Sequence, residues 1–220
     1  MKTITFIFAL TISAITMNAG ELDDKFAQYG LVDITSIDSS IVVDLKYATT
    51  DNFMGVNMYG DLNKAYLRPE IANMVAKAQQ SLKEINPEYT LVIYDAARPL
   101  SVQKRMFDTV QGTEFSQYVA DPYSGGGFHN FGCAVDVTIL YHGKPLEMGT
   151  PFDSFSPLSH IDNEQANLNN GSLSADAYNN RQLLRSVMTH AGFNTEPCEW
   201  WHFDFYTKDF ARSNLRLLAF

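Results

Sequence analysis

The stretch GGGFHNFGCAVDVTIL, residues 125–140, places an aspartate inside an apolar strand pattern, and this constrains the fold more than any other feature. Residues 133–140 alternate as a β-strand does, so Asp136 shares one face with Ala134 and Thr138, while the larger apolar side chains point the other way. An isolated carboxylate is costly to bury in apolar surroundings, so Asp136 needs a partner. We therefore expect a sheet with one core face and one face that lines a polar site.

A metal ion is the partner that the sequence favours. His129 precedes Asp136 by seven residues, and His202 follows in the segment EWWH. Histidine nitrogens and carboxylate oxygens are zinc ligands, and a catalytic zinc keeps three protein ligands and one open position. Each residue taken singly is more often unremarkable, but the joint pattern H-x-x-G-x-A-x-D followed by E-x-x-H is hard to obtain by chance. Three other histidines are expected to be surface or satisfied core residues: His142, His160 and His190.

Two further side chains have the chemistry of a hydrolase. Glu199 lies three residues before His202, and such positions point to opposite faces of a regular strand, so a bulge or a later strand start is needed to bring them together. A carboxylate beside the metal can take a proton from metal-bound water and pass it to the leaving group; the alternative is a surface glutamate. Arg98, just past a strand in YDAARP, can hold a developing oxyanion, or it can form a salt bridge with Asp95.

The remaining periodicities predict an α+β fold. Apolar residues at helical spacing cover residues 68–85, 101–111 and 175–193. Strand patterns cover residues 40–47, 89–96, 133–140 and 198–206. Residues 141–175 are expected to be mostly irregular. Helices and strands mix without a strict βαβ rhythm, which favours a single domain with a central, mainly antiparallel sheet flanked by helices and a zinc site on the sheet.

The first nineteen residues, MKTITFIFALTISAITMNA, predict a secretory signal peptide cut after Ala19. A membrane anchor is the alternative, but the apolar run is shorter than the roughly 20 residues that span a bilayer. Residues 20–220 would then form the mature domain, exported and periplasmic. A net charge of −9 disfavours nucleic-acid binding. No later segment is apolar enough to span a membrane, so we expect no stable membrane association after signal cleavage.

Cys133 and Cys198 are the chain's two cysteines, and each adjoins a metal motif. Metal binding would bring their strands close, and export makes a disulfide between them possible. The alternative is a pair of small buried thiols that never join. We predict the disulfide.

Six segments, in order along nearly all of the mature chain, resemble the D-alanyl-D-alanine dipeptidases, zinc enzymes of the vancomycin-resistance type. This resemblance implies one Zn²⁺ per chain on His129, Asp136 and His202, with zinc-bound water as the nucleophile. It also implies Glu199 as general base and then acid, and Arg98 as stabiliser of the transition state. The segments are VDLKYATTDNF (43–53), YDAARP (94–99), HNFGCAVDVTI (129–139), MGTPFD (148–153), NRQLLRSVMTHAGF (180–193) and EWWHFDF (199–205).

The resemblance extends to the substrate. It suggests Asp153 as the anchor for the substrate's free amino group and Tyr47 as a residue near the pocket, and of the two tryptophans beside the metal strand we expect Trp200 to wall the substrate. One position departs from the family: Gly127 stands where relatives often carry serine, and only Ser124 offers a nearby hydroxyl. The preference among related dipeptides therefore stays open.

Three functions are compatible with these residues. The first is a zinc dipeptidase that cleaves D-alanyl-D-alanine and similar small free dipeptides, scavenged from the cell wall in the periplasm. The second is a zinc D,D-carboxypeptidase that trims longer peptidoglycan stems, and the third is a non-catalytic, zinc-dependent domain that binds wall peptide. An amine anchor at Asp153 favours the first. Binding alone needs neither Glu199 nor Arg98, which argues against the third.

Overall fold

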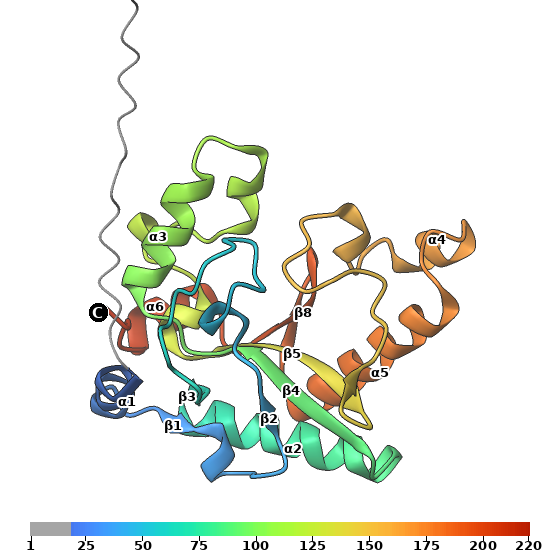
Figure 1. Ribbon diagram of the computed structural model, residues 1–220, viewed down its shortest axis with the longest axis horizontal. Coiled ribbons are helices and arrows are strands. Elements are labelled where there is room, and N and C mark those ends of the chain that lie inside the picture. The colour runs from blue at the N-terminus through green and yellow to red at the C-terminus, as the bar shows by residue number, and fades with distance from the viewer. Residues whose placement is uncertain (1–18) are drawn as a thin grey trace, which may run out of the picture.

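The computed structural model describes residues 19–220 of the 220-residue chain. The predicted signal peptide, residues 1–19, lies outside the described residues except for Ala19, which begins helix α1 (Ala19–Gln28). A central sheet has the strand order β2-β4-β5-β8-β7, and a short strand, β6, pairs with the end of β5 (Figure 1). All of these pairings are antiparallel except that of β2 with β4. The predicted single mixed domain with a mainly antiparallel sheet is confirmed.

The strands of this sheet are β2 (Val42–Val43), β4 (Tyr89–Asp95), β5 (Ala134–Tyr141), β6 (Lys144–Pro145), β7 (Asn194–Glu196) and β8 (Glu199–Asp204). A separate two-stranded sheet joins β1 (Val32–Asp33) to β3 (Tyr66–Leu67). Beyond α1, the helices are α2 (Pro69–Ile85), α3 (Leu100–Val110), α4 (Glu164–Asn169), α5 (Ala175–Ala191) and α6 (Lys208–Asn214).

The long predicted elements are found within one or two residues of their expected bounds. Helix α2 begins with Pro69, whose missing N–H costs nothing at a first helical position. Helix α5 begins after Ser174, whose Oγ accepts from the Ala177 N–H at 3.1 Å, and ends at Gly192 with a φ of +112°. The expected strand 40–47 is wrong for most of its length, because after β2 the chain turns into a 3₁₀ helix at Lys46–Ala48.

Several short elements carry no signal strong enough for the sequence to predict them. They are helices α1, α4 and α6 and strands β1, β3, β6 and β7. Helix α4 and strand β6 fall in the 141–175 region that was expected to be mostly irregular. Each of these elements except α1 has seven residues or fewer, so its periodicity covers at most two helical turns or three strand residues.

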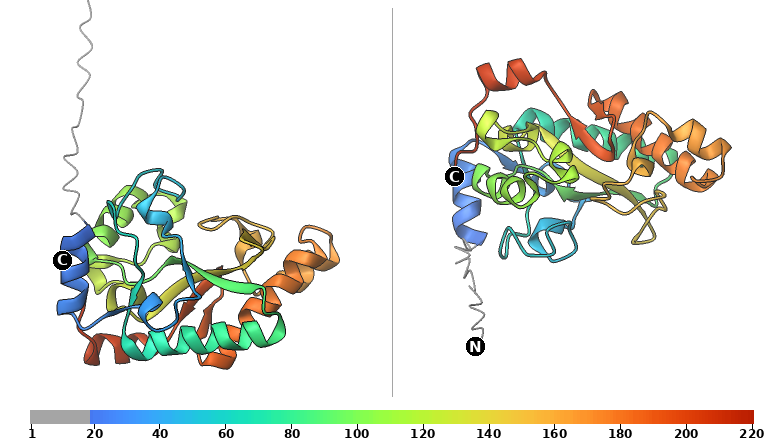
Figure 2. Two further views of the ribbon diagram at one scale, coloured as in Figure 1. Left: turned by 60° about the horizontal axis from the view of Figure 1, so that its bottom comes forward. Right: turned by 90° about the horizontal axis from the view of Figure 1, so that it is seen from above.

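Helices α2 and α5 lie side by side and cover one face of the sheet (Figure 2). Val75 and Leu82 of α2 are fully buried and belong to one apolar cluster with Val137 and Ile139 of β5. The other face of β5 carries the intervening side chains and is turned toward the loops that follow β2 and β6 (Figure 2). The core face and the site face of β5 therefore alternate as the pattern predicted.

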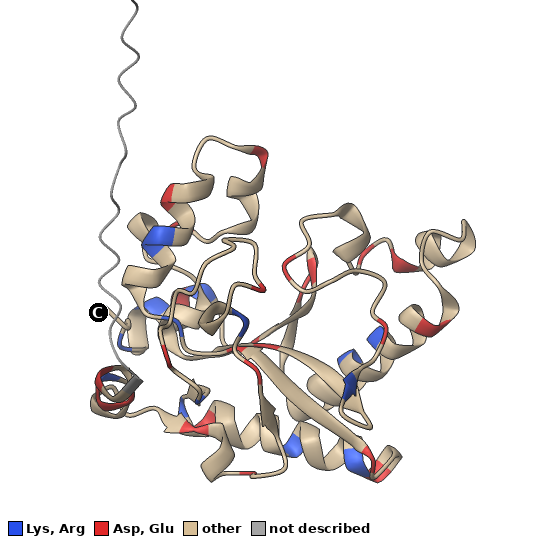
Figure 3. Ribbon diagram, viewed as in Figure 1, with Lys and Arg blue, Asp and Glu red and all other residues tan. Residues whose placement is uncertain are grey.

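The basic residues do not gather on one part of the fold. Lys and Arg are spread over separate helices and loops rather than gathered on one element, and Asp and Glu are interspersed among them (Figure 3). Within residues 19–220, no helix has both the length and the apolar character needed to cross a bilayer.

Candidate active site

The three residues predicted to bind a metal lie together on the open face of the sheet. His129 comes from a 3₁₀ turn, Phe128–Phe131, while Asp136 on β5 pairs directly with His202 on β8. His129 Nε2 lies 3.3 Å from Asp136 Oδ1 and 3.2 Å from His202 Nδ1, and His202 Nδ1 lies 3.0 Å from Asp136 Oδ1. All three side chains are buried and form a group able to hold a metal ion.

This triangle of donor atoms fits a tetrahedral zinc ion. With zinc bonds of about 2.0–2.1 Å, two corners of a tetrahedron stand about 3.3 Å apart. The three donor separations, 3.0 to 3.3 Å, match that edge closely. Two imidazole nitrogens and one carboxylate oxygen are also a donor set of catalytic zinc sites, which leave the fourth corner open. The residues present therefore fit the metal that the resemblance implies.

Polar neighbours lie on the far side of each histidine, a hydrogen-bond acceptor for His129 and a carboxylate for His202. His129 Nδ1 lies 2.6 Å from the Ala96 carbonyl oxygen, so the ring donates there and leaves Nε2 free to accept a metal. His202 Nε2 lies 3.6 Å from Asp204 Oδ2, and Asp204 accepts a hydrogen bond from Asn194. Burial acts to raise the pKa of Asp136, but the two neighbouring imidazoles outweigh it and hold that pKa below its ordinary value.

A bulge in β8 brings Glu199 to the same site. Thr195 of β7 pairs with Phe203, yet the next residue, Glu196, pairs with Glu199, so residues 200–202 bulge relative to β7. The Glu199 carboxylate consequently lies 3.8 Å from His202 Nδ1. Burial, with the charge of Asp136 adding to it and His202 opposing it, raises the pKa of Glu199 to about 7. A carboxylate with that pKa can both accept and donate a proton near neutral pH.

Arg98 forms the salt bridge with Asp95 and also lines the site cavity. Its Nε and Nη2 donate to Asp95 Oδ2 at 2.9 and 2.6 Å, and Nη1 donates to Gln103 Oε1 at 2.9 Å. Asp95 in turn accepts from the Tyr59 hydroxyl at 2.7 Å, and the guanidinium stands 5.0 Å from the centre of the Tyr47 ring. The salt bridge to Asp95 therefore holds the Arg98 guanidinium at the cavity. Arg98 can form this salt bridge and still face an oxyanion, so the two interpretations do not exclude each other.

Asp153 and Tyr47 meet at the edge of this cavity, whose volume is about 250 Å³. The Tyr47 hydroxyl donates to Asp153 Oδ1 at 2.9 Å, and the Phe53 N–H donates to Oδ2 at 3.3 Å. No Lys or Arg among residues 19–220 forms an ion pair with Asp153. Burial raises the pKa of this carboxyl to about 8. Asp153 also has a φ of +59°, a conformation that a non-glycine residue keeps only where its surroundings hold it.

Trp201 lines this cavity, whereas Trp200, which we expected to wall the substrate, does not. Trp200 lines a neighbouring groove, where its indole Nε1 donates to Thr150 Oγ1 at 2.9 Å. The bulge in β8 decides which of the two adjacent rings faces the cavity, and the sequence pattern does not locate that bulge. The aromatic side chain of Phe53 and the amide of Gln103 also line the cavity, and neither was singled out from the sequence.

The glycine at position 127 is explained by a close neighbour. A Cβ placed on Gly127 would lie 2.9 Å from the Cβ of Ala120, which is closer than two such atoms approach. Ser124 does not replace the missing hydroxyl, because it is exposed and donates to Asp121 Oδ2 at 2.7 Å. This part of the cavity therefore has no serine hydroxyl from either position.

The predicted disulfide between Cys133 and Cys198 is wrong, since both thiols are free. The Cys133 carbonyl accepts from the N–H of Phe205, at one end of β8, whereas Cys198 precedes the other end of that strand. The six residues of β8 lie between the two positions, a span of roughly 20 Å at about 3.3 Å per residue. The two metal motifs do meet. Because β5 and β8 are antiparallel and each cysteine precedes its strand, Cys133 and Cys198 lie at opposite ends of the strand pair.

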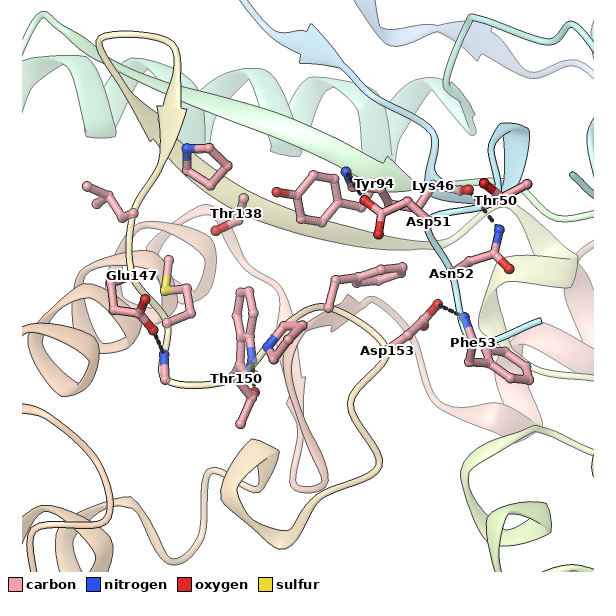
Figure 4. A pocket seen from close by; sticks show the side chains of 17 residues that line it. Lys46, Thr50, Asp51, Asn52, Phe53, Tyr94, Thr138, Glu147, Thr150 and Asp153 are labelled. Atoms are coloured by element: carbon pink, nitrogen blue, oxygen red, sulfur yellow. Dashed lines mark hydrogen bonds and ion pairs between the residues drawn. The ribbon is translucent and has the colours of Figure 1, made fainter. Parts of the chain in front are cut away.

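A second groove, of about 820 Å³, lies beside the site cavity on the same sheet face (Figure 4). Thr138, two residues beyond Asp136 on β5, lines it, as do Tyr94 and Glu147. Asp153 and Phe53 line both spaces. The loop that carries Asp153 therefore separates the groove from the cavity.

Comparison with known protein sequences identifies the family. The sequence model of peptidase M15, described as D-ala-D-ala dipeptidase, matches residues 27–217. The D-alanyl-D-alanine dipeptidase of Escherichia coli K12 is 34% identical over 175 residues, which cover 79% of this chain and 83% of that protein. The dipeptidase of the same name from Streptomyces coelicolor is 31% identical over 183 residues (75% and 86%), and that from Enterococcus faecium is 30% identical over 181 residues (73% and 83%). The chain therefore belongs to the peptidase M15 family of D-Ala-D-Ala dipeptidases and is a metallopeptidase.

Proposed function

We propose that this protein is a zinc-dependent dipeptidase that hydrolyses D-alanyl-D-alanine and similar small free dipeptides. The observation that carries the proposal is one cavity in which three different functional groups converge. A donor triangle that fits zinc lies at its floor, Glu199 stands beside that triangle, and Asp153 lies at its edge without a cationic partner among the described residues. These groups correspond to the needs of peptide hydrolysis: an electrophile, a proton carrier and an anchor for the substrate's amine.

The proposed roles of the side chains follow from their surroundings. When bound, zinc supplies a Lewis acid that polarises the scissile carbonyl and lowers the pKa of water at the site. Glu199, whose pKa is raised to about 7, accepts a proton from the attacking water and donates it to the leaving amine. Arg98, held in place by Asp95 and Gln103, presents a fixed positive charge to the oxyanion that develops on the carbonyl.

The amine anchor is the basis of the proposed substrate class. Asp153 is partly buried and accepts hydrogen bonds from the Tyr47 hydroxyl and the Phe53 N–H, both of which remain neutral. A free dipeptide brings a cationic amine that would complete this arrangement, whereas an acylated peptide brings a neutral amide and leaves the carboxylate unpaired. We therefore infer a preference for free dipeptides.

One observation favours the alternative, a zinc D,D-carboxypeptidase. The groove beside the cavity has room for a longer peptide, and only the loop at Asp153 separates the two spaces. We place the dipeptidase first because Asp153, the proposed amine anchor, lines the cavity that contains the metal-binding triad. We further propose that the enzyme acts after export, on dipeptides released from the cell wall; the signal-like sequence of residues 1–19 supports this location.

The test combines metal analysis with two substrates. Purified protein should contain one equivalent of zinc and should release D-alanine from D-Ala-D-Ala far faster than from N-acetyl-D-Ala-D-Ala. His142→Ala is a matched control for the ligand variants, because His142 is exposed and pairs only with Glu88. Equal turnover of the two substrates would replace the dipeptidase proposal with the carboxypeptidase. Protein that keeps its zinc but cleaves neither would favour the binding domain.

A further inference from the structure

The loop that carries Asp153 is held from behind by a buried arginine of helix α5. Arg181 is 2% exposed, and its Nε donates to the Met148 carbonyl oxygen at 2.6 Å. The neighbouring residue of the helix, Asn180, donates from Nδ2 to the Glu147 carbonyl oxygen at 2.8 Å. Helix α5 thus fixes the start of this loop through two backbone carbonyls, five and six residues before the anchor.

The middle of the loop packs directly on the same arginine. A Cβ on Gly149 would collide with Leu173 and would stand 3.4 Å from Arg181 Nη2. Gly149 also has a φ of +82°, which other residues rarely adopt. The loop backbone therefore lies against α5 with no space for a side chain between them.

A chain of contacts continues from Arg181 to the residue after Asp153. The guanidinium stands 5.8 Å from the centre of the Trp200 ring, and Trp200 Nε1 donates to Thr150 Oγ1 at 2.9 Å (Figure 4). Thr150 Oγ1 lies 2.9 Å from Ser159 Oγ, and Ser159 Oγ donates to the Ser154 carbonyl oxygen at 2.7 Å. The whole loop, residues 147–154, is thereby fixed on the side opposite to Tyr47 and Phe53.

The charge of Arg181 is balanced away from the loop. Its Nη1 pairs with Glu164 Oε1 at 3.3 Å. Arg185, one turn further along α5, pairs with the other oxygen of Glu164 but donates no hydrogen bond to residues 147–154. Two arginines of α5 therefore pair with the Glu164 carboxylate. Only Arg181 also bonds the loop, so Arg185 serves as a matched control.

We propose that Arg181 is a positioning residue that sets the place of Asp153 and thereby the selectivity for substrates with a free amine. This inference rests on the proposed function, in which Asp153 pairs with that amine. Asp153 has a left-handed backbone conformation that depends on its surroundings, and the contacts above hold the loop before it, at residues 147–150, and after it, at Ser154. A shift of about 1 Å in a positioned group can cost on the order of 100-fold in rate.

The test compares Arg181→Lys with Arg185→Lys in the zinc-loaded enzyme. Lysine keeps the charge beside Glu164, but it lacks the planar fork that reaches both Glu164 and the Met148 carbonyl. We expect Arg181→Lys to lower the ratio of kcat/KM for D-Ala-D-Ala over N-acetyl-D-Ala-D-Ala by about tenfold or more, mainly through KM of the free dipeptide. Arg185→Lys should keep that ratio within about threefold, a change of under 1 kcal/mol.

A double variant separates positioning from general destabilisation. If Arg181 acts through Asp153, then Arg181→Lys should change the ratio little further once Asp153→Asn is present, because the two effects are not additive. A folded Arg181→Lys protein with the wild-type ratio overturns the inference. Should that variant fail to fold, Trp200→Phe and Asn180→Ala remove other links of the same network, and a wild-type ratio in both also overturns it. A wild-type enzyme without any preference for the free amine instead refutes the proposed anchor itself.

Discussion

Replacing Asp153 by asparagine should make the free enzyme more stable and the enzyme less active, and the stability gain should grow with pH. Burial raises the pKa of this carboxyl from 3.8 to about 8, so the folded protein favours its neutral form. Below pH 3.8 the carboxyl is neutral in both folded and unfolded chains and costs no stability. As the pH rises from there to about 8, the unfolded chain gains by ionising and the folded protein loses stability.

The size of this effect follows from the pKa difference. A shift of about four units at about 1.4 kcal/mol per unit sets an upper limit of about 6 kcal/mol above pH 8. Partial access of water to the carboxylate reduces that figure, and we expect about 2–3 kcal/mol. For a domain of this size, 1 kcal/mol corresponds to about 2–4 °C in Tm. Asp153→Asn should therefore melt several degrees above wild type at pH 8.5, and by a smaller margin at pH 5.

The catalytic consequence has the opposite sign. Loss of one partner of a buried charge pair costs about 2–5 kcal/mol, so kcat/KM for free D-Ala-D-Ala should fall roughly 30-fold to several-thousand-fold. The N-acetylated substrate has no amine to lose and should be affected little. Stability and activity would then trade against each other at one residue, as they do where a site holds an unpaired buried charge for its ligand.

The assay is a set of melting curves of zinc-loaded protein at several pH values, with Asp162→Asn as the control because Asp162 is exposed. The test uses the difference in Tm between variant and wild type at each pH. Titrating groups that both proteins share contribute equally to both Tm values and drop out of this difference. A constant difference between pH 5 and 8.5 would mean that Asp153 does not have a raised pKa. A lower Tm for the variant at pH 8.5 would mean that the carboxylate stabilises the fold.

Four further predictions address the rest of the site. His202→Ala should lose zinc and activity together, as measured by metal content and turnover, and a full equivalent of bound zinc would remove His202 from the ligand set. Glu199→Gln should retain zinc and lose about 10²–10⁴-fold in kcat, because an amide cannot carry the proton; near-normal turnover would place the base elsewhere. Arg98→Lys should be nearly as poor as Arg98→Ala, since lysine cannot bond Asp95 and Gln103 as the planar guanidinium does; full activity would show that charge alone suffices. Unfolded, unreduced protein should show two titratable thiols, from Cys133 and Cys198, and none would restore the disulfide.

The sequence was most informative where one strand or helix carried the whole signal. The alternation through Asp136 predicted both faces of β5, and helical spacing predicted α2, α3 and α5. It was least informative where two segments had to be placed against each other. The bulge of β8 depends on its pairing with β7, and with it the choice of Trp201 over Trp200. The antiparallel register likewise decides that Cys133 and Cys198 lie far apart.

Helical periodicity could have singled out Arg181 from the sequence alone. Ala177, Leu184 and Met188 form the buried stripe of α5, and Arg181 occupies a position within that stripe. A charged residue at an apolar position of a helix is rarely buried without a partner. The partner, a loop carbonyl at Met148 together with Glu164, comes from segments with no periodic pattern, so the sequence indicates that Arg181 is special but not what it holds.

Three carboxyl groups around one cavity differ in their pKa, and their neighbours account for the difference. Asp136 faces two imidazoles, which hold its pKa low and keep it charged. Glu199 is partly buried beside one imidazole and the charge of Asp136, and its pKa of about 7 suits a group that takes up and releases a proton. Asp153 has only neutral hydrogen-bond donors, and its pKa of about 8 keeps it mostly protonated near neutral pH until a cation takes the place of that proton. We infer that each group takes a different positive charge: a metal ion for Asp136, a proton for Glu199 and the ammonium group of the substrate for Asp153.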